Sequence, residues 1–101
     1  MNIVGQKIYD WAVHLFPINR SLSGNGVRQT LQYIKNIIPE LKVNEVPSGT
    51  KCFDWTVPQE WNCGDGYIVD PDGNKICNFK VNNLHIVGYS TPVDKEIELE
   101  E

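Results

Sequence analysis

Hydrophobic residues near the start of the chain recur every three or four positions. Between residues 3 and 16 they form a single stripe, which consists of Val4, Ile8, Trp11 and Leu15 with Ala12 beside it. This spacing predicts an amphipathic helix that Pro17 ends, because proline cannot continue a helix. A second helix is predicted over residues 26–38, ahead of Pro39. Its apolar face consists of Val27, Leu31, Ile34 and Ile38.

Beyond Pro39 the period of the apolar positions changes from near four to two, which is typical of β-strands. Alternation predicts one strand over residues 41–46, which Pro47-Ser48-Gly49 closes, and a second strand over residues 52–57. A last strand is predicted over residues 84–89. The chain therefore changes from helical to β-rich near its middle.

A hairpin is predicted around the run Asp70-Pro71-Asp72-Gly73-Asn74. Residues 67–69 and 75–77 flank this run, and its proline and glycine suit a tight turn between antiparallel strands. Together with the preceding elements, the hairpin indicates an α+β fold. Two N-terminal helices are followed by a mainly antiparallel β-rich region.

Composition narrows the class of protein. A chain of 101 residues with 41% hydrophobic and 22% charged residues is expected to form one globular domain around one core. The net charge of −4 and the scattered positions of nine Lys and Arg exclude a nucleic-acid partner. Apolar runs are far shorter than the roughly 20 residues that span a bilayer, so no membrane segment is expected.

The amino terminus and the cysteines indicate a reduced compartment. The first residues lack a basic start, an uninterrupted apolar stretch and a cleavage site, so no secretory signal is predicted. Cys52, Cys63 and Cys77 are odd in number and too widely spaced for a Cys-x-x-Cys pair. A cytoplasmic location is therefore expected, with the thiols acting as buried or half-buried small hydrophobes.

The sequence offers no self-sufficient catalytic or metal site. A zinc site needs three or four converging ligands, whereas the chain has two unpaired histidines. His14 is interpreted as a surface or boundary residue, and the His85 side chain is expected to face away from those of Leu84 and Ile86. None of the cysteines lies in a recognisable nucleophile motif, although a cysteine meeting His85 in space stays open. No catalytic residue, cofactor-binding residue or metal ligand is therefore assigned to this chain.

Two loops resemble parts of ligand-binding motifs. Gly24-Asn25-Gly26 precedes a helix as a phosphate loop does, but the remaining spacing is missing, so turn geometry with a Ser or Asn cap is preferred. The acidic run from Asp70 lacks the closing Glu of a calcium loop, because its twelfth position is Val81. A hairpin turn is the preferred interpretation there.

Large aromatic residues have two interpretations. They either fill the core of a small domain or form a platform that stacks on a sugar or base. Core packing is preferred, and the platform is kept as an alternative. The residues in question are Phe53, Trp55, Trp61 and Tyr67.

Three stretches, residues 15–28, 46–62 and 83–93, carry a family resemblance that covers nearly the whole chain. They include the runs Asn19-Arg20-Ser21-Leu22-Ser23-Gly24 and Asp54-Trp55. The chain resembles the amino-terminal portion of a bacterial family of aminopeptidase-like proteins, related to zinc-dependent exopeptidases and labelled as containing a domain of unknown function. Two departures leave the loop geometry open: Ser23 replaces the family's more usual Thr, and residues 63–66 form a glycine-rich connection.

The resemblance implies a larger parent protein. Its metallopeptidase-like α/β body would be interrupted by a small β-rich insertion similar to the protease-associated domain. Residues 1–50 would be the helical part of that body and residues 51–101 the insertion-type region, or the two would form one continuous small domain. Zinc is implied for the full-length parent, with its ligands beyond this chain. The predicted partners are the remainder of the parent polypeptide and a peptide substrate.

The family signatures supply candidate contacts but no catalytic role. Asn19, Arg20, Ser21, Asp54 and Trp55 are candidates for contact with the substrate or the scaffold. Arg20 would either clamp a substrate carboxylate or brace two elements.

The end of the chain, residues 95–101, starts an element without a cap, which predicts that the natural polypeptide continues; a solvated tail is the alternative. The leading hypothesis is a non-catalytic N-terminal portion of a zinc-dependent aminopeptidase-like hydrolase, which supplies scaffold and a substrate-access surface. The alternatives are a peptide- or glycan-binding module whose platform is made of Trp55, Trp61 and Tyr67, and a purely structural domain.

Overall fold

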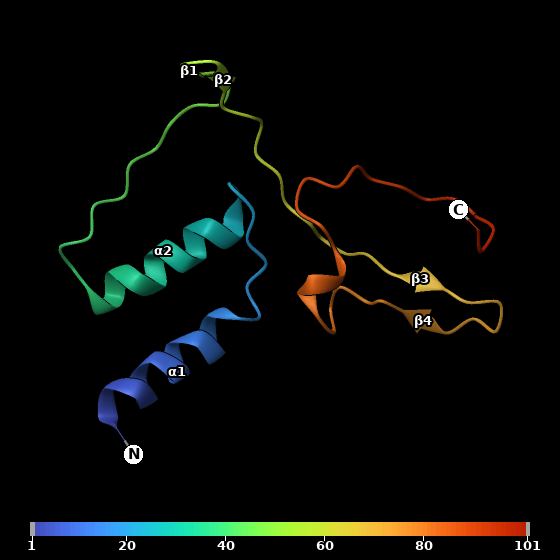
Figure 1. Cartoon of the computed structure of the whole chain (residues 1–101), viewed down its shortest axis with the longest axis horizontal. Coiled ribbons are helices and arrows are strands. Elements are labelled where there is room, and N and C mark those ends of the chain that lie inside the picture. The colour runs from blue at the N-terminus through green and yellow to red at the C-terminus, as the bar shows by residue number, and fades with distance from the viewer. Residues whose placement is uncertain (1, 101) are drawn as a thin grey trace.

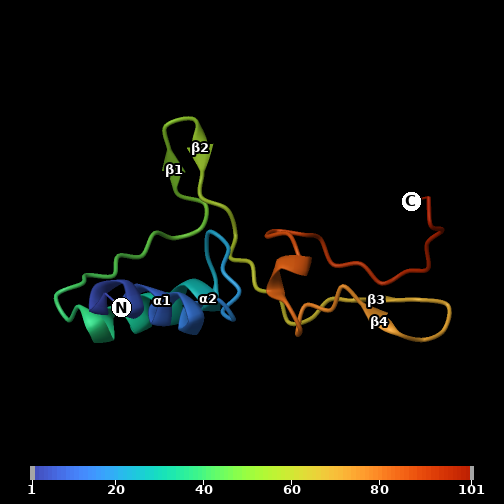
Figure 2. The same cartoon turned by 60° about the horizontal axis from the view of Figure 1, so that its bottom comes forward.

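The computed structural model describes residues 2–100 and begins with two helices, α1 (Ile3–Leu15) and α2 (Asn25–Ile37). Both confirm the predicted helices to within about one residue at each end. The side chain of Asn2 caps α1 by accepting a hydrogen bond of 2.9 Å from the Val4 amide. The helices lie side by side (Figures 1 and 2). A hydrogen bond of 2.8 Å between His14 Nδ1 and the Tyr33 hydroxyl joins them.

The remainder contains two short antiparallel hairpins, β1 (Lys51–Cys52) with β2 (Trp55–Thr56), and β3 (Ile68–Val69) with β4 (Lys75–Ile76). The second hairpin confirms its prediction. Asp70 Oδ1 accepts hydrogen bonds from the amides of Asp72 (3.0 Å) and Asn74 (2.8 Å). The carboxylate therefore stabilises the turn itself, as expected of an Asx-type turn.

The first hairpin corrects the prediction of a continuous strand over residues 52–57. The chain reverses at Phe53-Asp54, and Phe53 adopts a φ of 56°. A two-residue turn with positive φ at its first central position normally holds glycine there. A phenylalanine in this conformation costs roughly 1–2 kcal/mol. The turn was missed because Phe53 stands where glycine is typical, although Asp54 is a common turn residue.

The strands predicted over residues 41–46 and 84–89 are also wrong. Residues 41–46 are extended but pair with no strand of the described chain, and without a partner alternation does not make a strand. Residues Asn83–His85 form a short 3₁₀-helix, η1. The Asn82 side chain caps it by accepting a hydrogen bond of 3.0 Å from the Leu84 amide. The fold class is nevertheless α+β, as predicted.

The elements form an open layer without a hydrophobic core. The described chain measures 51 × 46 × 19 Å and has a radius of gyration of 17.9 Å, whereas a compact domain of this length has about 13 Å. It exposes 8879 Å², roughly 3,000 Å² more than a compact monomer of this mass. No hydrophobic side chain among residues 2–100 is buried, so the prediction of a single core is wrong.

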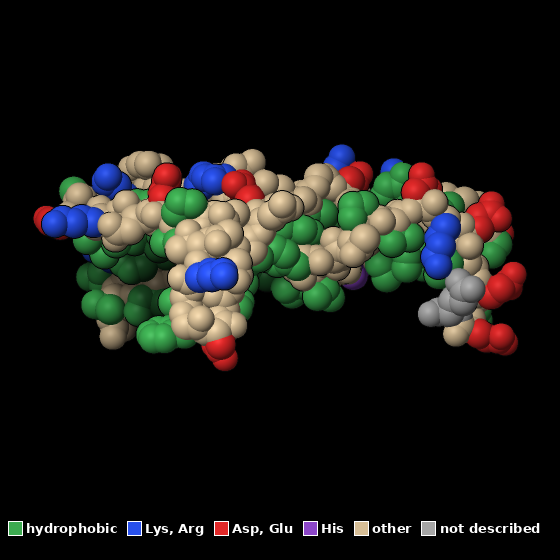
Figure 3. Space-filling model, turned by 90° about the horizontal axis from the view of Figure 1, so that it is seen from above, with side chains coloured by type: hydrophobic (Ala, Val, Ile, Leu, Met, Phe, Trp, Pro, Cys, Tyr) green, Lys and Arg blue, Asp and Glu red, His purple; other side chains and the backbone are tan. Residues whose placement is uncertain are grey.

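The layer is chemically two-sided. Seen edge-on, most charged side chains lie along one margin, while hydrophobic side chains gather toward the opposite margin (Figure 3). The α1 stripe is exposed as well, since Val4 and Ile8 remain 64% and 58% exposed. None of the helices in the described part of the chain is long and apolar enough to cross a membrane.

Most of the aromatic and cysteine side chains discussed above are exposed as well. Phe53, Trp55 and Tyr67 are exposed, which corrects the core-packing interpretation, and only Trp61 of the four is half-buried. The thiols behave similarly, with Cys52 and Cys77 exposed and Cys63 half-buried.

Residues 95–100 contain no helix or strand, and Glu101 lies outside the described residues. The division at residue 50 stays a prediction.

Candidate functional site

Three segments that are far apart in sequence meet where α2 begins. They are the loop entering α2, residues 59–62, and the turn after η1. We call this meeting point the Gly24 junction. It consists of Ser23, Gly24, Asn25, Arg28, Gln59, Glu60, Trp61, Asn62, Tyr89 and Ser90.

Gly24 lies at the centre of the junction and is the only buried residue of the described chain. Its φ of 99° and ψ of −176° fall in a region that is essentially restricted to glycine. A Cβ atom at this position would overlap the carbonyl oxygen of Trp61 and lie 2.7 Å from Asn62 Oδ1. Both backbone conformation and space therefore require glycine.

The cap of α2 comes from a distant part of the chain. Gly24 is the N-cap residue and has no side chain to offer, so the predicted local Ser or Asn cap is absent. Asn62 Oδ1 instead accepts a hydrogen bond of 2.7 Å from the Asn25 amide. One of the unpaired amides at the helix start is thus satisfied by residue 62.

Arg28 and Glu60 form a bidentate ion pair beside this cap. Arg28 Nη1 and Nη2 donate to the two carboxylate oxygens at 2.5 and 2.7 Å, and Asn62 Nδ2 donates to Glu60 Oε1 at 3.1 Å. The hydrogen bonds from Arg28, and secondarily from Asn62, lower the pKa of Glu60 to about 2. The same pairing raises the pKa of Arg28.

This pairing makes the junction sensitive to acid. Because the pKa of Glu60 is lower in the folded state than its usual 4.5, its contribution to stability is complete above about pH 4.5. It is lost as the pH falls toward 2. We expect Glu60→Gln to lower the denaturation midpoint at pH 6 and to leave it unchanged near pH 2. Urea unfolding of the intact parent between these pH values measures the difference, with a variant of the exposed Glu40, Glu40→Gln, as control. A difference that persists at pH 2 would contradict the assignment.

Hydroxyl groups link the other two segments. Tyr89 Oη donates to the Gln59 carbonyl at 3.0 Å. Since this uses its only proton, the Ser23 hydroxyl must donate across the 2.7 Å contact to Tyr89. Ser23 Oγ also accepts from the Trp61 amide at 3.2 Å. Both hydroxyl protons are committed to structural bonds, so Ser23 is a brace and not an activated nucleophile.

Trp61 completes the junction. Its indole stacks on the Tyr89 ring with a centroid separation of 5.9 Å, and its Nε1 donates to the Ser90 carbonyl at 3.0 Å. Tyr89 has a φ of 65°, a conformation that a non-glycine residue keeps only when its surroundings impose it. The stacking and the hydroxyl bonds supply that constraint.

A second cluster lies around Arg20, one of the sequence candidates. Arg20 Nη1 donates to the Leu15 carbonyl at 2.8 Å and to Thr30 Oγ1 at 3.3 Å. It therefore braces the end of α1 against α2, which is one of the two roles expected for it. A hollow of about 210 Å³ opens beside it. Its lining consists of Phe16, Ile18, Asn19, Arg20, Asn83, Leu84, Ile86 and Gly88.

The other sequence candidates fall into two places. Asn19 lines the Arg20 hollow, and its carbonyl oxygen occupies the space that a Cβ on Gly26 would need. Ser21 Oγ donates to the Ser23 carbonyl at 2.9 Å and accepts from the Ser23 amide. Asp54 and Trp55 lie instead on the β1–β2 hairpin, away from the helices (Figure 2).

The three rings of the predicted aromatic platform are not brought together. Trp55 belongs to β2, Trp61 stacks on Tyr89, and Tyr67 has Lys75 Nζ 4.2 Å above its ring. The β1–β2 and β3–β4 hairpins lie apart in both views (Figures 1 and 2). The arrangement thus does not favour a binding module built on these rings.

The described residues do not fit a zinc ion. Nowhere between residues 2 and 100 do three or more His, Cys, Asp or Glu side chains converge. His14 bonds to Tyr33, and the Cys63 thiol donates to the Asp65 carbonyl at 3.5 Å. No zinc ligand or metal-dependent step is therefore assigned to them.

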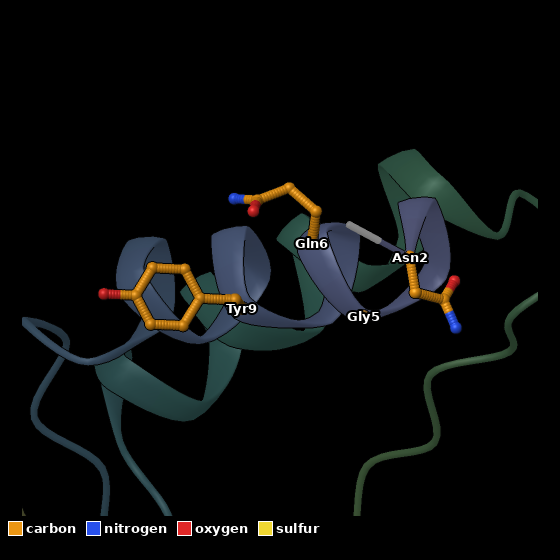
Figure 4. Close-up of a pocket in the computed structure, with 4 residues that line it drawn as sticks. All are labelled: Asn2, Gly5, Gln6 and Tyr9. Carbon is orange, nitrogen blue, oxygen red and sulfur yellow. The ribbon is translucent and has the colours of Figure 1, made fainter.

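A second hollow, of about 360 Å³, lies on α1 and is lined by Asn2, Gly5, Gln6 and Tyr9. All four residues belong to one face at the start of this helix, and no other element supplies a wall (Figure 4). Gln6 is already bonded to Asp10 at 2.8 Å. This hollow lacks the converging polar groups of a binding site.

The sequence interpretation missed the Gly24 junction. Arg28, Glu60 and Asn62 belong to the resembling stretches but stand alone in the sequence, without a motif to join them. One signal was present: a glycine at the N-cap position has no side chain to cap the helix, so a capping side chain has to come from elsewhere in the sequence.

Known proteins are similar to this chain in sequence and in structure. The sequence model of a family described as Domain of unknown function (DUF4910) matches residues 9–98. A protein of Clostridium acetobutylicum, provisionally named a polysaccharide biosynthesis protein with aminopeptidase-like domain, is 53% identical over 97 residues. The match covers 96% of this chain and 22% of that protein. A crystal structure of a protein from C. acetobutylicum, provisionally named a peptidase, has a TM-score of 0.84 and 53% identity, covering 91% of this chain and 22% of that chain.

Proposed function

The chain belongs to the family described as Domain of unknown function (DUF4910), and on this premise we propose that it is the non-catalytic N-terminal portion of a zinc-dependent aminopeptidase-like hydrolase. In that protein it supplies scaffold and a substrate-access surface. The relatives named as aminopeptidase-like and as a peptidase support the reaction class. The chain spans 22% of the length of each relative, which supports a larger parent.

One observation carries the proposal: the described residues form an ordered layer that buries no hydrophobic side chain. The excess exposed area, roughly 3,000 Å², is of the size that obligate interfaces bury. A relative whose chain is several times longer has a similar arrangement, with a TM-score of 0.84. We therefore propose that the remainder of the parent packs on the apolar face of the layer.

The scaffold role rests on the Gly24 junction. Its bonds fix the start of α2 relative to residues 59–62 and to the Tyr89 turn without using a reactive group. Zinc, when bound by the parent, would polarise a peptide carbonyl and activate water. Its ligands, in this proposal, belong to the remainder of the parent, and the layer borders the route by which a peptide enters.

A peptidase assay tests the proposal. The intact gene product that carries this chain is expected to release the amino-terminal residue from aminoacyl-7-amido-4-methylcoumarin. A chelator should abolish this activity and added zinc should restore it. The 101-residue chain alone should release no product. Hydrolysis by the chain alone, or a zinc-loaded parent without activity on a panel of aminoacyl substrates, would contradict the proposed role.

A further inference from the structure

The tip of the β1–β2 hairpin is the most exposed apolar point of the described chain outside the C-terminal segment. Phe53 is 102% exposed, and the neighbouring Trp55 is 52% exposed. The hairpin projects from the layer that contains the helices and the β3–β4 hairpin (Figure 2). Phe53 therefore makes no packing contact that would stabilise it within this layer.

The backbone at Phe53 is also unfavourable. Its φ of 56° lies in the left-handed region, where the turn would accept glycine without strain. Strained residues of this kind persist when other structure imposes them, and they gather at functional contacts. Neither the strain nor the exposure of Phe53 is offset within the described residues. The compensating contact is therefore to be sought outside them.

The hairpin is built to hold its tip firmly. The Val57 amide donates to the Thr50 carbonyl at 2.9 Å, and the Gly49 amide donates to the Val57 carbonyl at 2.8 Å. These bonds extend the ladder below the pairing of Cys52 with Trp55. Two exposed charged residues, Lys51 and Asp54, lie on either side of Phe53 in sequence. An aromatic anchor inside a polar rim is typical of the centre of a protein interface.

We infer that Phe53 is an anchor that seats in an apolar socket on the remainder of the parent polypeptide. This inference rests on the proposed function, because it requires a longer chain. The relatives supply the length, since this chain accounts for only 22% of each. Tethering in one polypeptide gives the socket a high effective concentration, which favours it over a second copy of the chain.

Phe53→Gly in the intact parent tests the anchor, because glycine relieves the backbone strain and removes only the ring. If the ring is seated, the thermal midpoint should fall by roughly 2–3 °C despite the relief of strain. Phe53→Leu, which keeps an apolar side chain, should lower it by less. Differential scanning calorimetry measures both, with size-exclusion chromatography on the same samples.

Two matched controls separate the effects. Cys77 is exposed and has a φ of 51°, so Cys77→Gly relieves similar strain without removing an anchor and should not lower the midpoint. Leu99 is also 102% exposed, so Leu99→Ala tests the loss of an exposed apolar group from the C-terminal segment. It should lower the midpoint by less than Phe53→Gly does, because Leu99 is not held in a strained turn.

Several outcomes would overturn the inference. An unchanged or raised midpoint for Phe53→Gly means that the ring is not seated. Conversion of a dimer to a monomer places the socket on a second copy, and a raised KM at an unchanged midpoint places the ring against the substrate. If the parent lacks peptidase activity but Phe53→Gly still lowers its thermal midpoint, the proposed function is wrong and the anchor inference stands. A reading frame that ends at Glu101 overturns both.

Discussion

Gly24→Ala is expected to lower the free energy of unfolding of the intact parent by roughly 3 kcal/mol or more. Alanine would be forced into a backbone region that is essentially restricted to glycine, since φ is 99° and ψ is −176°. Its Cβ would also overlap the Trp61 carbonyl oxygen. That oxygen is part of the backbone and cannot rotate away, so the segment carrying the Asn62 cap must shift. Urea unfolding of the purified variant measures the loss.

Two other glycines separate strain from collision. Gly49 has a φ of 88°, but no atom lies within 4 Å of the place that a methyl group would take, so Gly49→Ala should cost only about 1 kcal/mol of strain. Gly64 has no positive φ and open space around it, so Gly64→Ala should change the free energy of unfolding by no more than about 0.5 kcal/mol. If all three variants lose similar stability, the close approach of residues 61–62 to Gly24 is wrong.

Local patterns predicted the elements whose stability is local. The two helices follow from the spacing of their apolar residues and from Pro17 and Pro39, which act within a few positions. The β3–β4 hairpin follows from Asp70, whose carboxylate accepts two amides of its own turn. Such features need no knowledge of the rest of the molecule.

Elements that depend on distant contacts were not predictable. The turn at residues 53–54 contradicts the preference of Phe53, and the alternating residues 41–46 lack a partner strand among the described residues. The cap of α2 comes from Asn62, 37 positions away. The apolar stripe of α1 predicted a buried face, but Val4 and Ile8 of this stripe are exposed in the described layer. In the proposed function, the remainder of the parent covers them.

The candidate site likewise has one part that the sequence predicted and one part that depends on distant contacts. The segments that meet at the Gly24 junction belong to the stretches that carry the family resemblance. The family match over residues 9–98 confirms this resemblance. Of the candidates in those segments, Arg20 was given two roles, and its bonds to Leu15 and Thr30 favour bracing. The pairing of Arg28 with Glu60 was missed because it depends on a spatial approach that no spacing encodes.

The chain by itself is expected to lack a cooperative folding transition. Small domains already have little stability to spare, and this layer leaves its apolar side chains in water while ordering some 100 residues. The Gly24 junction is held mainly by exposed hydrogen bonds and one exposed ion pair, which each contribute little in water. In the proposed function, packing against the remainder of the parent supplies the missing hydrophobic stabilisation.

Thermal unfolding of the 101-residue chain, followed by circular dichroism and by binding of 1-anilinonaphthalene-8-sulfonate, tests this central claim most directly. The intact parent serves as the matched reference. We expect a gradual loss of helix signal and strong dye binding for the chain alone, against a cooperative transition and weak binding for the parent. A sharp cooperative transition of the isolated chain without dye binding would contradict the claim.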